Sequence, residues 1–220
     1  KRLERQLREL VRDADCEVEL LCPSGTVPEA IIGAVRESGA SLLVMGVARY
    51  NSVGDYFLGT AVDHVLRYSE IPTRVVKRRA SGPYRRVLVG TDFSEASRQV
   101  LDQAQALLPE ADFHAVHAYH VPFDGWQKAE YVRKEVEKAE RKVFDEFLQI
   151  HPETRKRVTT HLVYGSPGSA LRKDIRESEA ELLVLGTHGE SALRHATIGS
   201  TANELLRSLP VDTLVVTNRE

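Results

Sequence analysis

Three glycines and two hydroxyl residues near the C-terminus are the residues best suited to bind a charged ligand. Gly186 ends an apolar run, Gly189 follows it closely, and Gly199, Ser200 and Thr201 come after nine more residues. Glycine lets the backbone approach a ligand closely. We expect a helix to begin near Gly199, where free N–H groups of Gly199, Ser200 and Thr201 collect partial positive charge. This arrangement predicts a phosphate site.

Other interpretations of this segment stay open. The glycines could be turn residues without a ligand. His188 lies in the same loop and could contact phosphate or be a solvated loop histidine. A Walker A loop is excluded, because no Gly-Lys-Ser or Gly-Lys-Thr sequence occurs in this segment.

Histidines and cysteines do not form a convincing metal motif. His114, His117 and His120 are closely spaced, but alternation along a strand places His114 and His117 on opposite faces. Cys16 and Cys22 are too few and too irregularly placed for a disulfide framework or a Cys-x-x-Cys site. We therefore predict no metal site. No nucleophile–base pair or carboxylate dyad is readable, so no catalytic residue is predicted and the chain is not expected to be an enzyme.

The composition is that of a globular protein without a preferred charged partner. The chain has 30 Lys and Arg residues against 32 Asp and Glu residues, a net charge of −2. No field of one sign therefore draws it to nucleic acid or to an anionic membrane. Its apolar runs are far shorter than the roughly 20 residues of a membrane span. We expect a cytoplasmic protein with neither nucleic acid nor membrane as a partner.

The chain contains an internal repeat at an offset of 140 residues, which aligns Ser41 with Glu181. The apolar segment 41–46 matches 181–186, and 73–76 matches 213–216, with no gap between Gly25 and Val76. A repeat of this length indicates a duplicated domain.

The second copy alternates strands and helices. Short apolar runs predict five strands, and helical periodicity or turn signals predict four helices between them. One long helix is expected between residues 126 and 150, with a core-facing stripe of apolar residues every three or four positions. The strands are expected at 87–90, 113–119, 159–164, 182–185 and 213–217, and the stripe comprises Ala129, Val132, Val136, Ala139, Val143 and Phe147. This order predicts an α/β fold in which helices cover both faces of an open, five-stranded parallel sheet.

The first copy is incomplete. Residue 1 aligns with residue 141, so the counterparts of the first two strands are absent, and only strands three, four and five are expected. We predict a partial domain at 1–77, a linker at 78–83 and a complete domain at 84–220. The expectation is a truncated or incompletely ordered form of a tandem protein of roughly 275 residues, or a gap that a neighbouring chain fills.

The glycine pattern of the second copy resembles the ATP-binding signature of the universal stress protein family. The segments 90–94 (Gly-Thr-Asp-Phe-Ser), 116–119 (Val-His-Ala-Tyr) and 210–216 (Pro-Val-Asp-Thr-Leu-Val-Val) resemble other parts of that family's pattern. The resemblance covers all of 84–220 and, as a partial copy, 1–77. It implies the strand order 3-2-1-4-5, with a ligand bound where the connectivity reverses between strands one and four.

The resemblance also implies roles for single residues. Thr91 and Asp92 end strand one, and Asp92 would meet the ribose or a Mg²⁺-bound phosphate. Ala118 stands where the family usually has a valine whose backbone recognises adenine. Gly186, Gly189, Gly199 and Ser200 would cradle the phosphates, with Thr201 beside them. The alternative for Asp92 is a helix cap.

The matching loop of the first copy departs from this pattern. Arg49 replaces the second glycine, and the strand that would carry the aspartate is absent. An arginine could pair with a phosphate, but with that strand missing we predict no nucleotide site in the first copy.

The resemblance implies an ATP-binding protein, with or without Mg²⁺, whose output is regulation or protection under stress. One alternative is an enzyme that slowly hydrolyses ATP or phosphorylates itself, and another is a structural module that binds no nucleotide. The last strand of each copy is an apolar sheet edge, and such edges need a cover. We expect an intramolecular pseudo-dimer of the two copies, and a homodimer through the last strands.

Overall fold

The computed structural model describes residues 2–12, 14–49, 56–121, 129–149, 157–187 and 199–217. The chain divides into two compact units, Lys1–Ala40 and Ser41–Glu220. The first unit contains α1 (Arg2–Leu10) and α2 (Val27–Ser38). α2 has a proline in its first turn and ends at Gly39, whose φ of 62° is a left-handed conformation that favours glycine.

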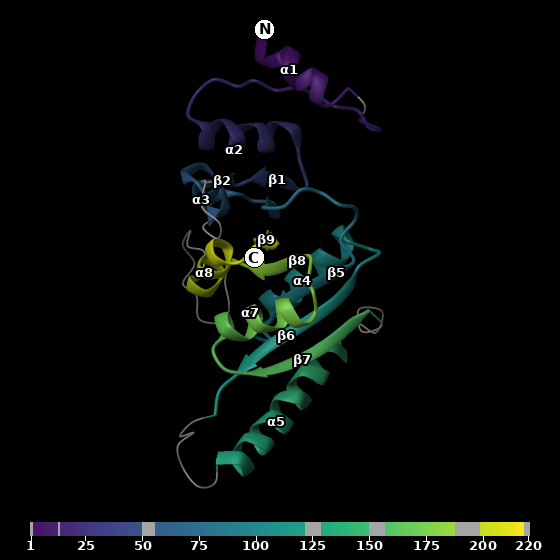
Figure 1. The fold of residues 1–220 in the computed structure, drawn as a ribbon, viewed down its shortest axis with the longest axis vertical. Helices are drawn as coiled ribbons and strands as arrows, with labels where there is room; N and C mark the ends of the chain where they lie inside the picture. The colour runs from purple at the N-terminus through teal and green to yellow at the C-terminus, as the bar shows by residue number, and fades with distance from the viewer. Residues whose placement is uncertain are drawn as a thin grey trace. The chain divides into compact units, whose positions relative to one another are not determined.

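The second unit is built on a seven-stranded sheet (Figure 1). In spatial order the strands are β1 (Leu43–Gly46), β4 (Thr73–Val76), β9 (Asp212–Val216), β8 (Leu182–Gly186), β5 (Arg86–Gly90), β6 (Asp112–Tyr119) and β7 (Val158–Tyr164). A separate two-stranded hairpin joins β2 (Ala48–Arg49) and β3 (Tyr56–Phe57).

The strand order within the second copy is the predicted one. Strands three, two, one, four and five are β7, β6, β5, β8 and β9, and all neighbouring pairs among them are parallel. The α/β class is therefore confirmed. β4 and β1 continue the same sheet through an antiparallel pair between β4 and β9, so the sheet has two more strands than the five of the second copy.

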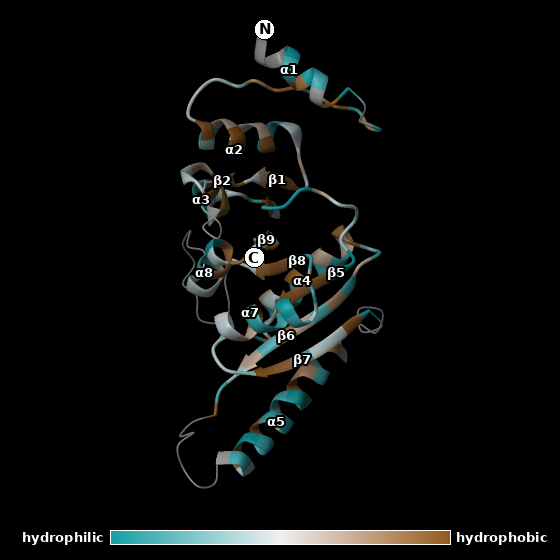
Figure 2. Cartoon of the chain, in the orientation of Figure 1, coloured by the Kyte–Doolittle hydropathy of each residue, from teal (hydrophilic) through white to brown (hydrophobic). Residues whose placement is uncertain are grey.

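Helices cover both faces of this sheet, as predicted. They are α3 (Thr60–Tyr68), α4 (Glu95–Leu107), α5 (Ala129–Gln149), α7 (Pro167–Glu177) and α8 (Ser200–Ser208). One core packs α3, α7 and α8 on the sheet, and the other packs α4 and α5. β8 supplies both cores, because alternate side chains point to opposite faces: Leu183 joins the first, and Leu182 and Val184 join the second. Figure 2 shows β8 as strongly apolar.

The predicted core-facing stripe of α5 is wrong for most of its length. Val132 and Val143 are 38% and 42% exposed, whereas Phe144, Phe147 and Leu148 are buried. The two phenylalanines offer more apolar area than the valines, so the helix turns its aromatic side toward the sheet. α5 is largely hydrophilic along the rest of its surface (Figure 2).

The third strand expected in the first copy does not form. Residues 19–24, which align with β7, have no regular secondary structure. β7 pairs only with β6, and the described part of the first copy contains no counterpart of β6. Residues 19–24 therefore have no strand with which to pair. None of the helices in the described ranges has the length and apolarity that a bilayer crossing requires.

The two copies meet where β4 pairs with β9. Thr73 lies opposite Val215, Arg74 opposite Leu214, and Val75 opposite Thr213. With the repeat offset of 140 residues, Arg74 and Leu214 are equivalent positions, so this register is symmetric about them. The repeated last strands therefore pair as two related copies.

Asp212 joins the end of β4 to the start of β5. Its Oδ1 accepts hydrogen bonds from the backbone N–H groups of Lys77, at 2.7 Å, and Arg78, at 3.0 Å. Its Oδ2 accepts from the Tyr84 hydroxyl at 2.5 Å. A single buried carboxylate thus holds both ends of the linker, so we expect its loss to cost more than the loss of a surface charge.

Lys77 is buried beside this carboxylate. Its Nζ donates to Leu209 O at 3.0 Å, and the residue is only 2% exposed. Burial lowers the pKa of Lys77 to about 8, although the nearby Asp212 charge acts in the opposite direction. Burial and the hydrogen bond to Asp212 raise the pKa of Tyr84 to about 12.

We predict that Asp212→Ala lowers the free energy of unfolding by roughly 3 kcal/mol, because it leaves three hydrogen-bond donors without their acceptor and removes the negative charge beside the buried Lys77. Urea denaturation measures the change. The control is Glu110→Ala, which removes an exposed partner of Arg85 and should change stability by less than about 0.5 kcal/mol. Equal effects of the two substitutions would contradict the role of Asp212.

We also predict a rise in stability with pH that depends on Lys77. Above pH 8 the folded chain releases the Lys77 proton, whereas the unfolded chain holds it to about pH 10.5. The unfolded state then binds more protons, so the free energy of unfolding increases with pH, by up to about 1.4 kcal/mol per pH unit. Tyr84 acts in the opposite direction, but only above pH 10.

Urea denaturation between pH 8 and about pH 9.5 tests this dependence. Lys77→Met should flatten the rise, and Lys134→Met, which changes an exposed lysine of α5, should leave it intact. Parallel curves for wild type and Lys77→Met would refute the assignment.

Candidate functional site

The carboxyl ends of β5 and β8 lie side by side and define the candidate site. The two strands pair in parallel, with Val89 opposite Val184, so both leave the sheet at the same edge. β6 continues the sheet beyond β5, and β9 continues it beyond β8. Ligands of open α/β sheets bind where the strand order reverses in this way.

Gly90, the last residue of β5, is tightly packed against side chains of α7 and β8. A Cβ at this position would lie 3.3 Å from Leu171 Cδ1 and 3.4 Å from Leu185 Cδ2. The absence of a side chain lets α7 and β8 close on the end of β5. The edge of the site is therefore set by packing from both neighbouring elements.

Thr91 and Asp92 form a turn that hydrogen bonds hold in place. The Thr91 N–H donates to Val116 O at 3.0 Å, and Thr91 Oγ1 accepts from the Phe93 N–H at 3.1 Å. Asp92 Oδ1 accepts from the Ser94 N–H at 3.1 Å and from the Ser94 hydroxyl at 2.5 Å. Asp92 is partly exposed, and these hydrogen bonds restrain its rotamer.

Ser94, and not Asp92, caps α4. Ser94 Oγ accepts from the Ser97 N–H at 3.1 Å. The alternative that Asp92 is the helix cap is wrong, because its Oδ1 accepts from the residue two positions later, in an Asx turn. Asp92 accepts a hydrogen bond from the hydroxyl of this N-cap serine and lies two residues before it, outside the helix.

His117 ties this turn to β6. Phe93 has a φ of 64°, which is uncommon for a residue with a side chain. Its ring stacks on the His117 imidazole with 4.0 Å between centroids. His117 Nδ1 lies 2.9 Å from Thr91 O, to which it donates, and its Nε2 lies 3.7 Å from Glu140 Oε2 on α5. The sequence motif included His117 but did not indicate this positioning role.

The end of β8 is connected directly to the start of α8. The Thr187 N–H donates to Val216 O at 3.1 Å, and Thr187 O accepts from the Gly199 N–H at 3.0 Å. The expectation of a free N–H at Gly199 is therefore wrong, because this donor is used by the strand end. Gly199 is the N-cap of α8 and contributes no side-chain cap. Among the described residues, no side chain caps this first turn, which contains the N–H groups of Ser200 and Thr201.

The predicted site residues fall on neighbouring strand ends where they are described. Thr91 follows β5, Ala118 lies near the end of β6, and Gly186 ends β8. Ser200 and Thr201 begin α8. Gly189 and His188 lie outside the described residues.

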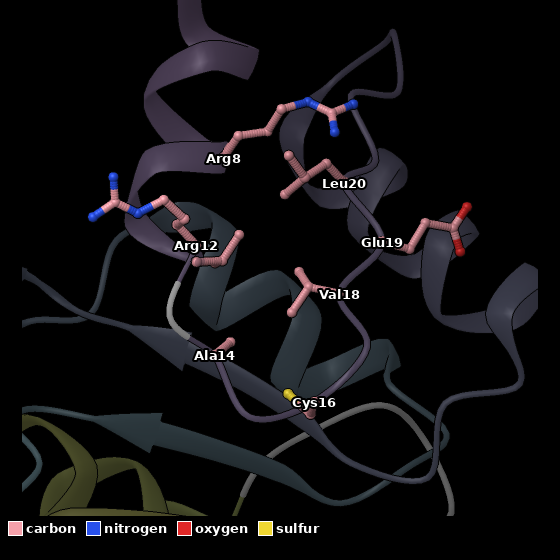
Figure 3. A pocket seen from close by; sticks show the side chains of 8 residues that line it. Arg8, Arg12, Ala14, Cys16, Val18, Glu19 and Leu20 are labelled. Carbon is pink, nitrogen blue, oxygen red and sulfur yellow. The ribbon is translucent and has the colours of Figure 1, made fainter.

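The first unit contains a separate pocket of about 540 Å³. Figure 3 shows the guanidinium groups of Arg8 and Arg12 on its rim, with Cys16 and Glu19 on the segment that follows α1. It contains none of the residues predicted from the sequence. We assign it no function.

Comparison with known proteins relates both copies to the same protein family. The model of the universal stress protein family matches residues 1–77 and 83–217. A universal stress protein of Methanocaldococcus jannaschii is 25% identical over 149 residues, which cover 63% of this chain and 85% of that protein.

Two solved structures share the fold. A universal stress protein from Archaeoglobus fulgidus matches with a TM-score of 0.70 at 22% identity, over 98% of this chain and 77% of the other. A universal stress protein structure from Pseudomonas aeruginosa matches with a TM-score of 0.71 at 19% identity, with the same coverage. At these identities the likeness establishes the fold alone.

We predict that His117→Phe keeps the ring stack on Phe93 but loosens the 91–94 turn, because the hydrogen bond to Thr91 O is lost. A bond of about 1 kcal/mol corresponds to roughly fivefold faster opening. Native-state amide hydrogen exchange at Phe93 and Ser94 measures it. His120→Phe, three residues along the chain, is the control, and equal exchange in both variants would contradict the role of His117.

Proposed function

Because the chain belongs to the universal stress protein family, we propose that its second copy, residues 84–220, binds an adenine nucleotide. The proposed ligand is ATP, and its proposed role is regulation or protection under stress. The observation that carries the proposal is the direct link between the end of β8 and the start of α8, beside the end of β5.

The phosphates fit the start of α8. Ser200 and Thr201 provide backbone N–H groups at the positive end of a nine-residue helix, together with two hydroxyl groups. Gly199 has no side chain to block the approach. Gly186, which ends β8, is proposed to lie beside the phosphates, and Gly189 is proposed for the same role on the family resemblance.

The remainder of the nucleotide fits the β5 and β6 ends. Asp92 is partly exposed and restrained, which suits a ribose hydroxyl or a phosphate-bound Mg²⁺, and Thr91 adjoins it. The backbone of Ala118 is available for adenine near the end of β6. A carboxylate and phosphate oxygens are the ligands that Mg²⁺ prefers.

The first copy is proposed not to bind nucleotide. Within the described sheet, β1 corresponds to β8, but it has only β4 as a neighbour. The strand reversal that creates the site between β5 and β8 is therefore missing there. The first-copy helix α3 begins at Gly59 and Thr60 without an adjacent aspartate-bearing strand end.

We also propose that the two copies act as an intramolecular pseudo-dimer. The symmetric β4–β9 register supports this arrangement, as does the ion pair of 3.0 Å between Arg207 on α8 and Asp63 on α3. β4 and β9 each have a neighbour on both sides. Neither retains a free edge, so the expected homodimer through the last strands is not proposed further.

We predict that the double substitution Gly199→Ala and Ser200→Ala weakens ATP binding by about tenfold to a hundredfold, because the Ser200 hydroxyl contact to a charged phosphate is lost and a methyl group at position 199 obstructs its approach. The backbone should tolerate alanine, because Gly199 has a φ of −51° and its Cβ would lie 3.7 Å from Thr187 O. Calorimetric titration with ATP and Mg²⁺ measures the affinity.

Thr60→Ala, at the position that corresponds to Ser200 in the first copy, is the matched control and should bind ATP like wild type. Unchanged affinity in the double variant would refute the proposed site. A parallel turnover assay tests the enzyme alternative. Hydrolysis above the uncatalysed rate that disappears in Asp92→Asn would favour a slow ATP-hydrolysing enzyme over a regulatory binder.

A further inference from the structure

We propose that His114 and His161 form a binding site for a divalent transition metal ion, of which Zn²⁺ is the best fit. His114 lies on β6 and His161 on β7. In the paired strands His114 is opposite Thr159 and Val116 is opposite His161, so the two histidines lie diagonally on the same face. The sequence had directed attention to histidines within one strand, whereas the structure pairs histidines from two.

Both imidazole rings are oriented by an oxygen partner at Nδ1. His161 Nδ1 lies 2.9 Å from Asp174 Oδ1 on α7, and His114 Nδ1 lies 2.9 Å from Thr159 Oγ1. The Nε2 atom of each ring is then the nitrogen left for a ligand. Histidines that bind metal ions almost always have their other nitrogen held in this way, frequently by a carboxylate.

The separation of the rings fits one tetrahedral ion. The two centroids are 5.5 Å apart and the ring planes are inclined by 84°. With Zn–N bonds of about 2.0–2.1 Å, two imidazoles on the same tetrahedral ion have centroids roughly 5 Å apart. The observed separation of the centroids is therefore close to that of two imidazoles on one ion.

Asp174 places a buried negative charge beside the pair. The residue is only 4% exposed, and its Oδ2 is buried without a hydrogen-bond partner in the described part of the chain. An unsatisfied carboxylate oxygen is costly in a protein interior. Asp174 also lies in the last turn of α7, where the helix dipole adds partial negative charge. A cation bound at His161 Nε2 would add positive charge across the ring from Asp174, which would stabilise both the buried carboxylate and the end of the helix.

The site is open to solvent and separate from the proposed nucleotide site. β7 is an edge strand, and the His161 side chain is 39% exposed. His114 lies near the amino end of β6, whereas Ala118 lies at its carboxyl end. Within the described ranges no group of three or more His, Cys, Asp or Glu side chains is placed to hold a metal ion. The two histidines supply two of the four ligands of a tetrahedral Zn²⁺ ion, so two water molecules must complete the coordination.

Calorimetric titration with Zn²⁺ tests the proposal on the full chain. Because the chain contains 8 histidines, the control variant is His64→Gln, at a histidine on α3 outside the pair. We expect His114→Gln and His161→Gln each to weaken Zn²⁺ binding at least about tenfold, and Asp174→Asn to weaken it about tenfold to a hundredfold. His64→Gln should bind like wild type.

Imidazole ¹⁵N chemical shifts provide a second readout that does not depend on the stability of the variants. In wild-type protein, one equivalent of Zn²⁺ should shift the Nε2 resonances of both His114 and His161. Unchanged shifts of these two rings, or equal Zn²⁺ affinity in wild type and in both pair variants, would overturn the proposal. Zn²⁺ binding should persist in the Gly199→Ala, Ser200→Ala double variant, which separates this result from the nucleotide proposal.

Discussion

The antiparallel pair between β4 and β9 is the interaction on which the rest of the second unit depends. Without it, β4 and β1 would be a two-stranded fragment, and β9 would be an exposed apolar edge. The pair is extended by Asp212, which accepts two backbone hydrogen bonds and one from Tyr84 at the ends of the linker. Lys77 is buried beside this carboxylate. The junction therefore combines strand pairing with a buried positive charge, which a protein interior tolerates only when a negative charge lies nearby.

The candidate site is a consequence of the sheet and of its packing, and the glycine motif alone would not produce it. β5 and β8 must be neighbours for Thr91 and Gly186 to meet at one edge. The turn after β5 is then held by the cap at Ser94 and by His117 from the adjacent strand. On the β8 side, the bond from the Gly199 N–H to Thr187 O fixes where α8 starts. The described strand ends and helix starts on both sides are therefore held by hydrogen bonds before any ligand binds, which reduces the entropy that binding must overcome.

The repeat, the alternation of strands and helices and the strand order of the second copy could be predicted, because they depend on local apolar patterns and on a family resemblance. Features that depend on which distant residues pack or pair in the folded chain could not be predicted. The core-facing stripe of α5 was misassigned because Phe144 packs on the sheet in place of the valines. Hydrophobic periodicity does not show which of two apolar stripes on a helix will be buried. The expected strand at 19–24 failed for lack of a neighbouring strand. The use of the Gly199 N–H by Thr187, and the pairing of His161 with Asp174, join residues that are 12 and 13 positions apart through backbone geometry that the sequence does not encode locally.

β6 connects the two proposed sites, and its structure indicates that they act independently. The strand carries His114 near its start and Ala118 near its end, and it is hydrogen-bonded to β5 on one side and β7 on the other. His114 contacts Thr159, while His117 contacts Thr91 and Phe93 on the opposite face. Coupling between distant sites requires an element with two arrangements that both ligands bias. A central strand with both edges paired has one arrangement, so a metal ion at its amino end and a nucleotide at its carboxyl end should each bind without altering the affinity for the other.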